Sequence, residues 1–141
     1  MNQQPNGILD TNTVILLPRI SDDSLLPPYP TITSITLAEL SVGPLVATDD
    51  ATRAARLTHL QQAETDFDPL PFDAAAARAF GRVASSLRSS GRKPAARAYD
   101  ALIAAIAVAR NLPLYTVNPD DFAGIADLTV HPVAHPDAST T

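Results

Sequence analysis

Residues 95–122 read AARAYDALIAAIAVARNLPLYTVNPDDF. The first part, from Ala95 to about Arg110, is rich in alanine, leucine and isoleucine, which predicts a helix. The segment Leu114–Val117 is apolar and contains β-branched residues, so it predicts a short buried strand. Residues 118–121, NPDD, predict a turn. A helix that leads into a strand and a polar turn is typical of an α/β protein.

The same alternation extends over the rest of the chain. We expect strands at 8–9, 31–35, 67–72 and 128–130, and helices at about 11–17, 36–47, 51–63 and 74–89. Asp73 would cap the 74–89 helix, and residues 18–30, with four prolines, would be irregular. The pattern predicts an α/β fold, a three-layer α/β/α domain around a central, mostly parallel sheet. We expect one domain at 7–134 between disordered tails, 1–6 and 135–141.

Composition narrows the class of protein. The chain has 141 residues, 45% of them hydrophobic and none of them cysteine, which excludes disulfides and thiolate chemistry. Because there is no long apolar run and no secretory signal, we expect a cytoplasmic protein without membrane spans. The net charge of −5 argues against general binding to nucleic acid. A cluster of basic residues between 78 and 97 leaves room for local binding.

Four acids follow strands or begin helices in this arrangement: Asp10, Glu39, Asp100 and Asp121. Ligands of parallel sheets bind at the carboxyl ends of the strands, where these acids would gather. Clustered carboxylates repel one another unless a cation neutralises them, and Mg²⁺ and Mn²⁺ prefer oxygen ligands. The pattern therefore indicates a metal site.

Each acid also has an interpretation that involves no metal. Glu39 could complete a capping box with Thr36, and Asp100 could simply interact with the helix dipole. Asp121 and Asp10 could be ordinary turn residues. The pattern alone leaves both interpretations open.

Four segments resemble the motif blocks of one family. These are ILDTN (8–12), TSITLAEL (33–40), AYDALIAA (98–105) and LPLYTVNPDDF (112–122). They are similar, in order and spacing, to the conserved blocks of PIN-domain ribonucleases. Thr33 and Asn12 each stand where the family usually has serine, and the second of these departures bears on the details of metal binding.

The resemblance implies a PIN-like fold, a Mg²⁺ site in which Mn²⁺ can substitute, and single-strand endoribonuclease activity through a metal-activated water. It assigns catalysis and metal binding to the four acids, with Asn12, Thr116, Asn118 and Asp120 in support. Asp120 is the alternative to Asp121 as the fourth acid. The size is similar to that of VapC toxins, which implies a homodimer, a VapB-like antitoxin and a heterotetramer or larger complex.

RNA would be held by basic residues near Asp100, namely Arg97, Lys93 and Arg92. For Arg97 an ion pair with a nearby acid is an equal alternative, because arginine suits both phosphates and carboxylates. Two other functions compete with the nuclease. One is a catalytically silent PIN-like module that binds RNA or protein. The other is a haloacid-dehalogenase-like phosphatase, which the absence of a D-x-D motif at Asp10 argues against.

Overall fold

The computed structural model of the chain describes residues 4–93 and 97–138. In these residues the sheet has four strands in the order β2-β1-β3-β4, and every pairing is parallel. The strands are β1 (Gly7–Leu9), β2 (Pro30–Thr31), β3 (Leu114–Thr116) and β4 (Val130–Pro132). The helices are α1 (Thr11–Leu16), α2 (Ser34–Val42), α3 (Asp50–Asp66), α4 (Ala74–Ser89) and α5 (Ala98–Arg110).

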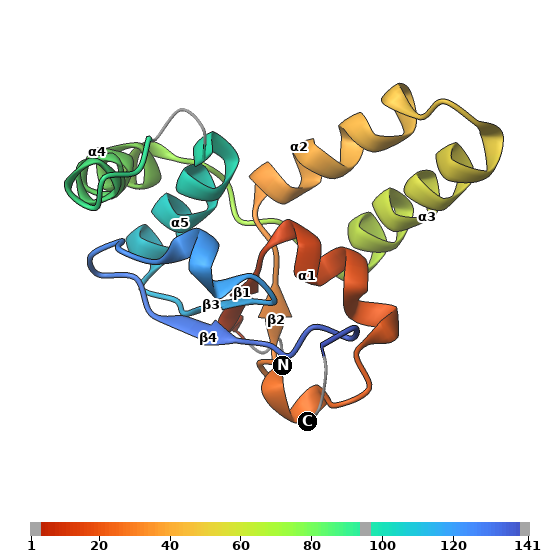
Figure 1. Cartoon of the computed structure of the whole chain (residues 1–141), viewed down its shortest axis with the longest axis horizontal. Coiled ribbons are helices and arrows are strands. Elements are labelled where there is room, and N and C mark those ends of the chain that lie inside the picture. Colours follow the sequence, from red (N-terminus) through yellow and green to blue (C-terminus); the bar gives the residue numbers. More distant parts are fainter. Residues whose placement is uncertain (1–3, 94–96, 139–141) are drawn as a thin grey trace.

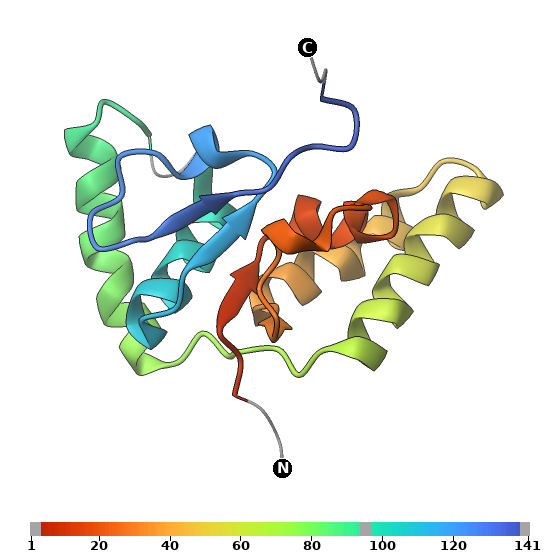
Figure 2. The same ribbon diagram turned by 90° about the horizontal axis from the view of Figure 1, so that it is seen from below.

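The sheet lies between two groups of helices (Figures 1 and 2). Side chains alternate along a strand, so Ile8 of β1 packs into the core beneath α4 and α5. Its neighbour Leu9 packs into a second core with Val14, Leu40 and Ala63 from α1, α2 and α3. Burial on both faces is what a parallel sheet requires, and the predicted three-layer α/β/α fold is confirmed.

The Ala-rich helix α5 is the centre of the larger core. Ala101 and the whole stretch 103–107 are inaccessible to solvent. The helix ends at Asn111, whose φ of 54° is left-handed, and Leu112 N–H bonds back to the carbonyl of Ala107 at 3.0 Å. Of the predicted helix, residues 95–96 lie outside the described part of the chain.

Several predicted boundaries were wrong. The predicted 31–35 strand stops at Thr31, because the Thr33 hydroxyl accepts the Thr36 N–H at 3.3 Å and begins α2 at Ser34. This helix ends at Val42 instead of 47, and a 3-10 turn, Gly43–Val46, follows with a proline at its start. The 67–72 segment forms only an isolated bridge, at Leu70, and the last strand begins two residues late, at Val130.

Parts of both predicted tails make contacts with the domain. The Asn6 N–H donates to the Tyr29 carbonyl at 3.0 Å, and Asp137 pairs with Arg19. Residues 1–3 and 139–141 lie outside the described part of the chain, so the predicted disorder stays a prediction. No helix of the described residues is long and apolar enough to cross a membrane.

Candidate active site

Asp10 follows β1 directly and caps the amino end of α1. Its Oδ1 accepts the Thr13 N–H at 3.3 Å and also the Thr13 hydroxyl, while Oδ2 accepts the Thr116 hydroxyl at 2.7 Å. Thr116 ends β3, the neighbour of β1 in the sheet. The carboxylate is therefore fixed between two adjacent strand ends, and only 4% of the residue is exposed.

Glu39 projects towards Asp10 from the second turn of α2. Its Oε1 accepts the Thr11 hydroxyl at 2.7 Å, and the Thr11 hydroxyl also lies 3.0 Å from that of Thr36. Because Thr33 caps this helix, Thr36 and not Glu39 occupies the third helical position. The capping-box interpretation of Glu39 is therefore wrong, since its carboxylate bonds a side chain of α1 and not the helix end.

The other two acids, Asp100 and Asp121, lie in later segments of the chain. Asp100 lies in the first turn of α5, and Asp121 lies in a 3-10 turn, Pro119–Phe122, that follows β3. An Arg97 guanidinium nitrogen lies 2.5 Å from Asp121 Oδ1, and both side chains are about one-third exposed. The structure thus forms the ion pair that the sequence left as one of two roles for Arg97.

Three of the four acids have pKa values that are raised in part by the charges of their neighbours. Burial is the main cause that raises the pKa of Asp10, and the charge of Asp121 adds to it against hydrogen bonds from Thr13 and Thr116. Burial likewise raises the pKa of Glu39, and the Asp10 charge contributes. Acids whose charges interact in this way lie near one another at the carboxyl edge of the sheet, and their shared role stays a prediction.

Asp100 shows the strongest effect of this crowding. Burial raises its pKa to about 6, and the negative charges of Asp121, Asp10 and Glu39 all act in the same direction. Only Arg97 opposes them. Of the adjacent pair 120 and 121, the acid whose charge reaches both Asp10 and Asp100 is Asp121.

The predicted supporting residues have different surroundings. The Thr116 hydroxyl bonds Asp10 and accepts the Asn118 N–H at 2.9 Å, so it connects the first acid to the turn that carries Asp121. Asn118 precedes that turn and makes no side-chain cap bond. Asn12 is exposed, beside Thr11 in the wall of a hollow that also includes Glu39.

Sequence reasoning missed two threonines. Thr11 holds Glu39, and the fully buried Thr13 hydroxyl donates to Asp10 while it accepts the Val117 N–H at 3.1 Å. The signal for Thr13 is its spacing, because a hydroxyl three residues after a helix-capping aspartate can reach the carboxylate. No local sequence signal predicts the role of Thr11, because its partner Glu39 is 28 positions away in the chain and becomes its neighbour only in the folded structure.

The predicted RNA-binding residues Arg92 and Lys93 follow the end of α4. Lys93 is exposed, and Arg92 is partly buried with its backbone N–H bonded to the Leu87 carbonyl at 2.8 Å. Within the described residues no hydrogen bond or ion pair joins either side chain to the four acids. Their role in RNA binding stays a prediction.

The donor set suits a hard divalent cation, but the side chains are turned towards protein partners. In residues 4–93 and 97–138 no three His, Cys, Asp or Glu side chains are grouped closely enough to hold a metal ion. Asp10, Glu39 and Asp121 instead bond threonines or Arg97. Crowded, mutually repelling carboxylates are the oxygen ligands that Mg²⁺ prefers, so the chemistry of the site fits the ion.

Comparison with known proteins identifies the family. The profile of the PIN domain matches residues 8–128. The chain belongs to the PIN-domain family. The family resemblance drawn from the four motif blocks is thereby confirmed, and the segment matched contains all four acids.

Relatives that resemble this chain include proteins named VapC. Ribonuclease VapC5 of Mycobacterium tuberculosis is 41% identical over 121 residues, which cover 84% of this chain and 87% of the relative. The crystal structure of VapBC-5, a toxin–antitoxin system of the same organism, matches with a TM-score of 0.76 and 36% identity over 92% of this chain and 100% of that one. VapBC2 of Rickettsia felis, bound to a DNA fragment from its promoter, matches with a TM-score of 0.69 and 26% identity over 90% and 98%.

Proposed function

We propose that this PIN domain is a Mg²⁺-dependent endoribonuclease for single-stranded RNA and the toxin of a toxin–antitoxin pair. The observation that carries the proposal is the convergence of Asp10, Glu39, Asp100 and Asp121, where the charges of neighbouring acids help to raise the pKa values of the first three. The relative named ribonuclease VapC5 supports the RNase activity. The two VapBC complexes support an antitoxin as the partner.

The residues of the site would have different roles in metal binding, orientation and RNA binding. Asp10 and Asp100 would hold Mg²⁺ directly, with Glu39 and Asp121 completing the set. When bound, the divalent cation would supply Lewis acidity, offsetting the charge of the crowded acids and of a phosphate oxygen. Thr13 and Thr116 keep Asp10 in one orientation, and Thr11 does the same for Glu39. Arg97, released from Asp121, would be free to contact a phosphate.

The test is cleavage of total cellular RNA by the purified chain, with Mg²⁺ or with EDTA. We expect discrete fragments that require Mg²⁺ or Mn²⁺ and disappear in Asp10→Asn. Glu64→Gln, which removes one charge from the exposed face of α3, is the matched control and should cleave normally. An active Asp10→Asn protein would exclude this site as the nuclease centre.

One observation favours the second candidate, a catalytically silent module that binds RNA or protein. No three of the acids are grouped for a metal ion in the described residues. Calorimetric titration with Mg²⁺ separates the two candidates. Binding that is lost in Asp10→Asn supports the nuclease, whereas a folded wild-type chain that neither binds Mg²⁺ nor cleaves RNA is the silent module.

We expect a second copy of the chain or the antitoxin to bind a surface that exposes apolar side chains. Val42, Leu45 and Val46, at the tip joining α2 and α3, are 49%, 84% and 61% exposed, and Leu57 of α3 is 42% exposed. Exposed apolar groups gathered in one place are typical of interaction surfaces. We expect a homodimer by light scattering, and a larger complex, a heterotetramer or above, when the chain is co-expressed with its antitoxin. A monomeric chain at all concentrations would contradict the dimer.

A further inference from the structure

A hollow of about 220 Å³ lies beside the acidic site, between α1, α2 and α3. Its walls include Ile15 and Leu40, which are apolar, and Asn12, Arg56 and His59, which are polar. Pockets for drug-sized ligands measure roughly 300–1,000 Å³, so this hollow suits a smaller group, of the size of one nucleobase. Glu39 forms part of its wall, and the hollow is therefore continuous with the candidate active site.

The walls combine the groups that recognise a single-stranded base. Bases of RNA stack on aromatic rings and guanidinium planes and hydrogen-bond through their edges. The imidazole of His59 supplies a ring on α3, and Asn12 supplies an amide at the start of α1. Ile15 and Leu40 make the remaining wall apolar, which suits the face of a base.

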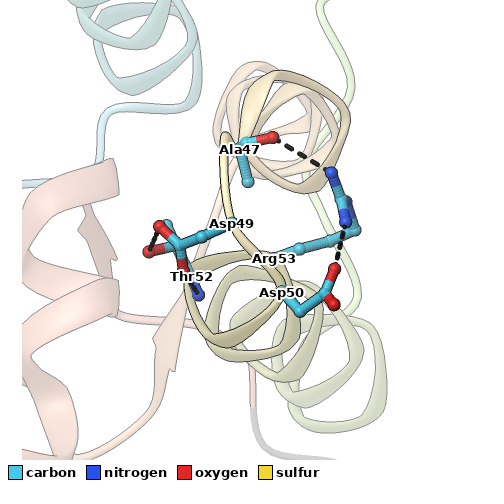
Figure 3. Close-up of polar contacts among 5 residues, drawn as sticks. All are labelled: Ala47, Asp49, Asp50, Thr52 and Arg53. Atoms are coloured by element: carbon cyan, nitrogen blue, oxygen red, sulfur yellow. Dashed lines mark hydrogen bonds and ion pairs between the residues drawn. The ribbon is translucent and has the colours of Figure 1, made fainter.

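Arg53, which lies one turn earlier on α3, already has two hydrogen-bond partners. Arg53 donates to Asp50 Oδ1 at 2.9 Å and to the Ala47 carbonyl at 3.1 Å, as Figure 3 shows. In the same view Asp49 accepts both the N–H and the hydroxyl of Thr52, at 2.8 and 2.9 Å. These bonds stabilise the connection between α2 and α3. Arg53 is not one of the residues that line the hollow.

Arg56, in contrast, points to the hollow without a carboxylate bonded to it. Its guanidinium donates to the Gly43 carbonyl at 3.0 Å, and within the described residues it makes no ion pair. The charge of Asp49 acts on Arg56 from nearby, but its oxygens are used by Thr52. A Cβ on Gly43 would lie 3.3 Å from the Arg56 Cδ, so glycine allows the stem to lie close. The guanidinium is thus held at the hollow with its charge available to a phosphate.

We propose that this hollow holds the nucleotide that adjoins the scissile phosphate of single-stranded RNA, with His59 against its base and Arg56 on its backbone phosphate. The inference rests on the proposed nuclease function. A peptide side chain is the other possible occupant. A guanidinium with no carboxylate bonded to it, in the same hollow as Glu39, favours the nucleotide, because a phosphate can accept its hydrogen bonds directly.

The experiment uses the full chain and a single-stranded RNA pool of random sequence, with the fragment ends sequenced. We expect the wild type to prefer certain bases at one position next to the cut. Arg56→Ala and His59→Ala should each lower kcat/KM about tenfold, mainly through KM, and flatten the preference at that position. His59→Phe keeps a stacking ring and should restore most of the affinity.

The matched control is Arg53→Ala, which removes the same charge from an exposed position one turn earlier on α3, outside the hollow. It should leave the base preference unchanged. Thermal unfolding of each variant shows whether it is folded. A folded Arg56→Ala or His59→Ala protein that keeps the wild-type preference and KM would overturn the proposal, as would loss of antitoxin affinity alone, which would assign the hollow to a peptide.

A separate binding measurement distinguishes failure of this proposal from failure of the nuclease proposal. Fluorescence anisotropy of the labelled RNA pool in EDTA reports binding without cleavage. If the wild type cleaves nothing but Arg56→Ala binds the pool about tenfold more weakly than Arg53→Ala, the hollow binds RNA and only the nuclease proposal fails. Equal affinities of the two variants would refute the subsite.

Discussion

Replacing Asp100 with asparagine should make the metal-free protein more stable while it removes the proposed activity. Burial and three negative neighbours raise the pKa of Asp100 to about 6 from an ordinary 3.8. Because the folded-state pKa lies above the unfolded-state value, the ionised carboxylate destabilises the fold. That penalty is fully present above pH 6 and disappears as the pH falls from about 6 towards 3.8.

The size of the effect follows from the pKa difference. A difference of about 2.2 pH units corresponds to about 3 kcal/mol at 1.36 kcal/mol per unit. Asp100 is partly exposed, so screening by water reduces this value, and we expect Asp100→Asn to add about 1–2 kcal/mol to the free energy of unfolding at pH 8. For a chain of this length the corresponding rise in Tm is about 3–8 °C.

The assay is thermal unfolding followed by circular dichroism in EDTA, from pH 5 to pH 8. The gain from Asp100→Asn should shrink towards pH 5, and Glu64→Gln, on the exposed face of α3, should show no such gain. Saturating Mg²⁺ should make the wild type more stable than Asp100→Asn, because an ion at about 100 times its Kd stabilises the wild type by about 2.7 kcal/mol. A variant no more stable than the wild type at pH 8, or a gain independent of pH, would refute the electrostatic reasoning.

Three further predictions concern single side chains. Thr13→Val removes the hydroxyl bond to Asp10 and strands the buried Val117 N–H, so we expect a loss of about 2–3 kcal/mol in urea unfolding, and a loss under 0.5 kcal/mol would contradict it. Asp73→Ala removes the cap of α4, whose N–H bond is 3.0 Å long, and should cost about 1 kcal/mol, with Asp73→Asn as the control that keeps the cap. Arg97→Ala should weaken RNA binding and reduce the slope of log K against log salt by about 0.7 if Arg97 contacts a phosphate. An unchanged slope would show that Arg97 does not contact a phosphate and serves only in the ion pair with Asp121.

The errors of sequence analysis lie at boundaries where two local signals compete. The segment 31–35 alternates like a strand, yet Thr33 has a hydroxyl that can cap a helix, and the cap determines where α2 begins. That shift of the helix start also excludes the capping-box interpretation of Glu39, whose carboxylate accepts the Thr11 hydroxyl instead. At Asp73 only one signal acts, and the predicted cap is found there.

The sequence by itself determined the α/β class, the helix that forms the centre of the core, and the four acids that its strands and helices would carry. These depend on hydrophobic periodicity and capping, which act between residues close in the chain. Only the tertiary structure decided what each carboxylate touches: Asp10 bonds Thr116, 106 positions away, Glu39 bonds Thr11, and Asp121 pairs with Arg97. Such partners depend on charge and hydrogen bonding through space, and these forces act only after the sheet has brought the strand ends together.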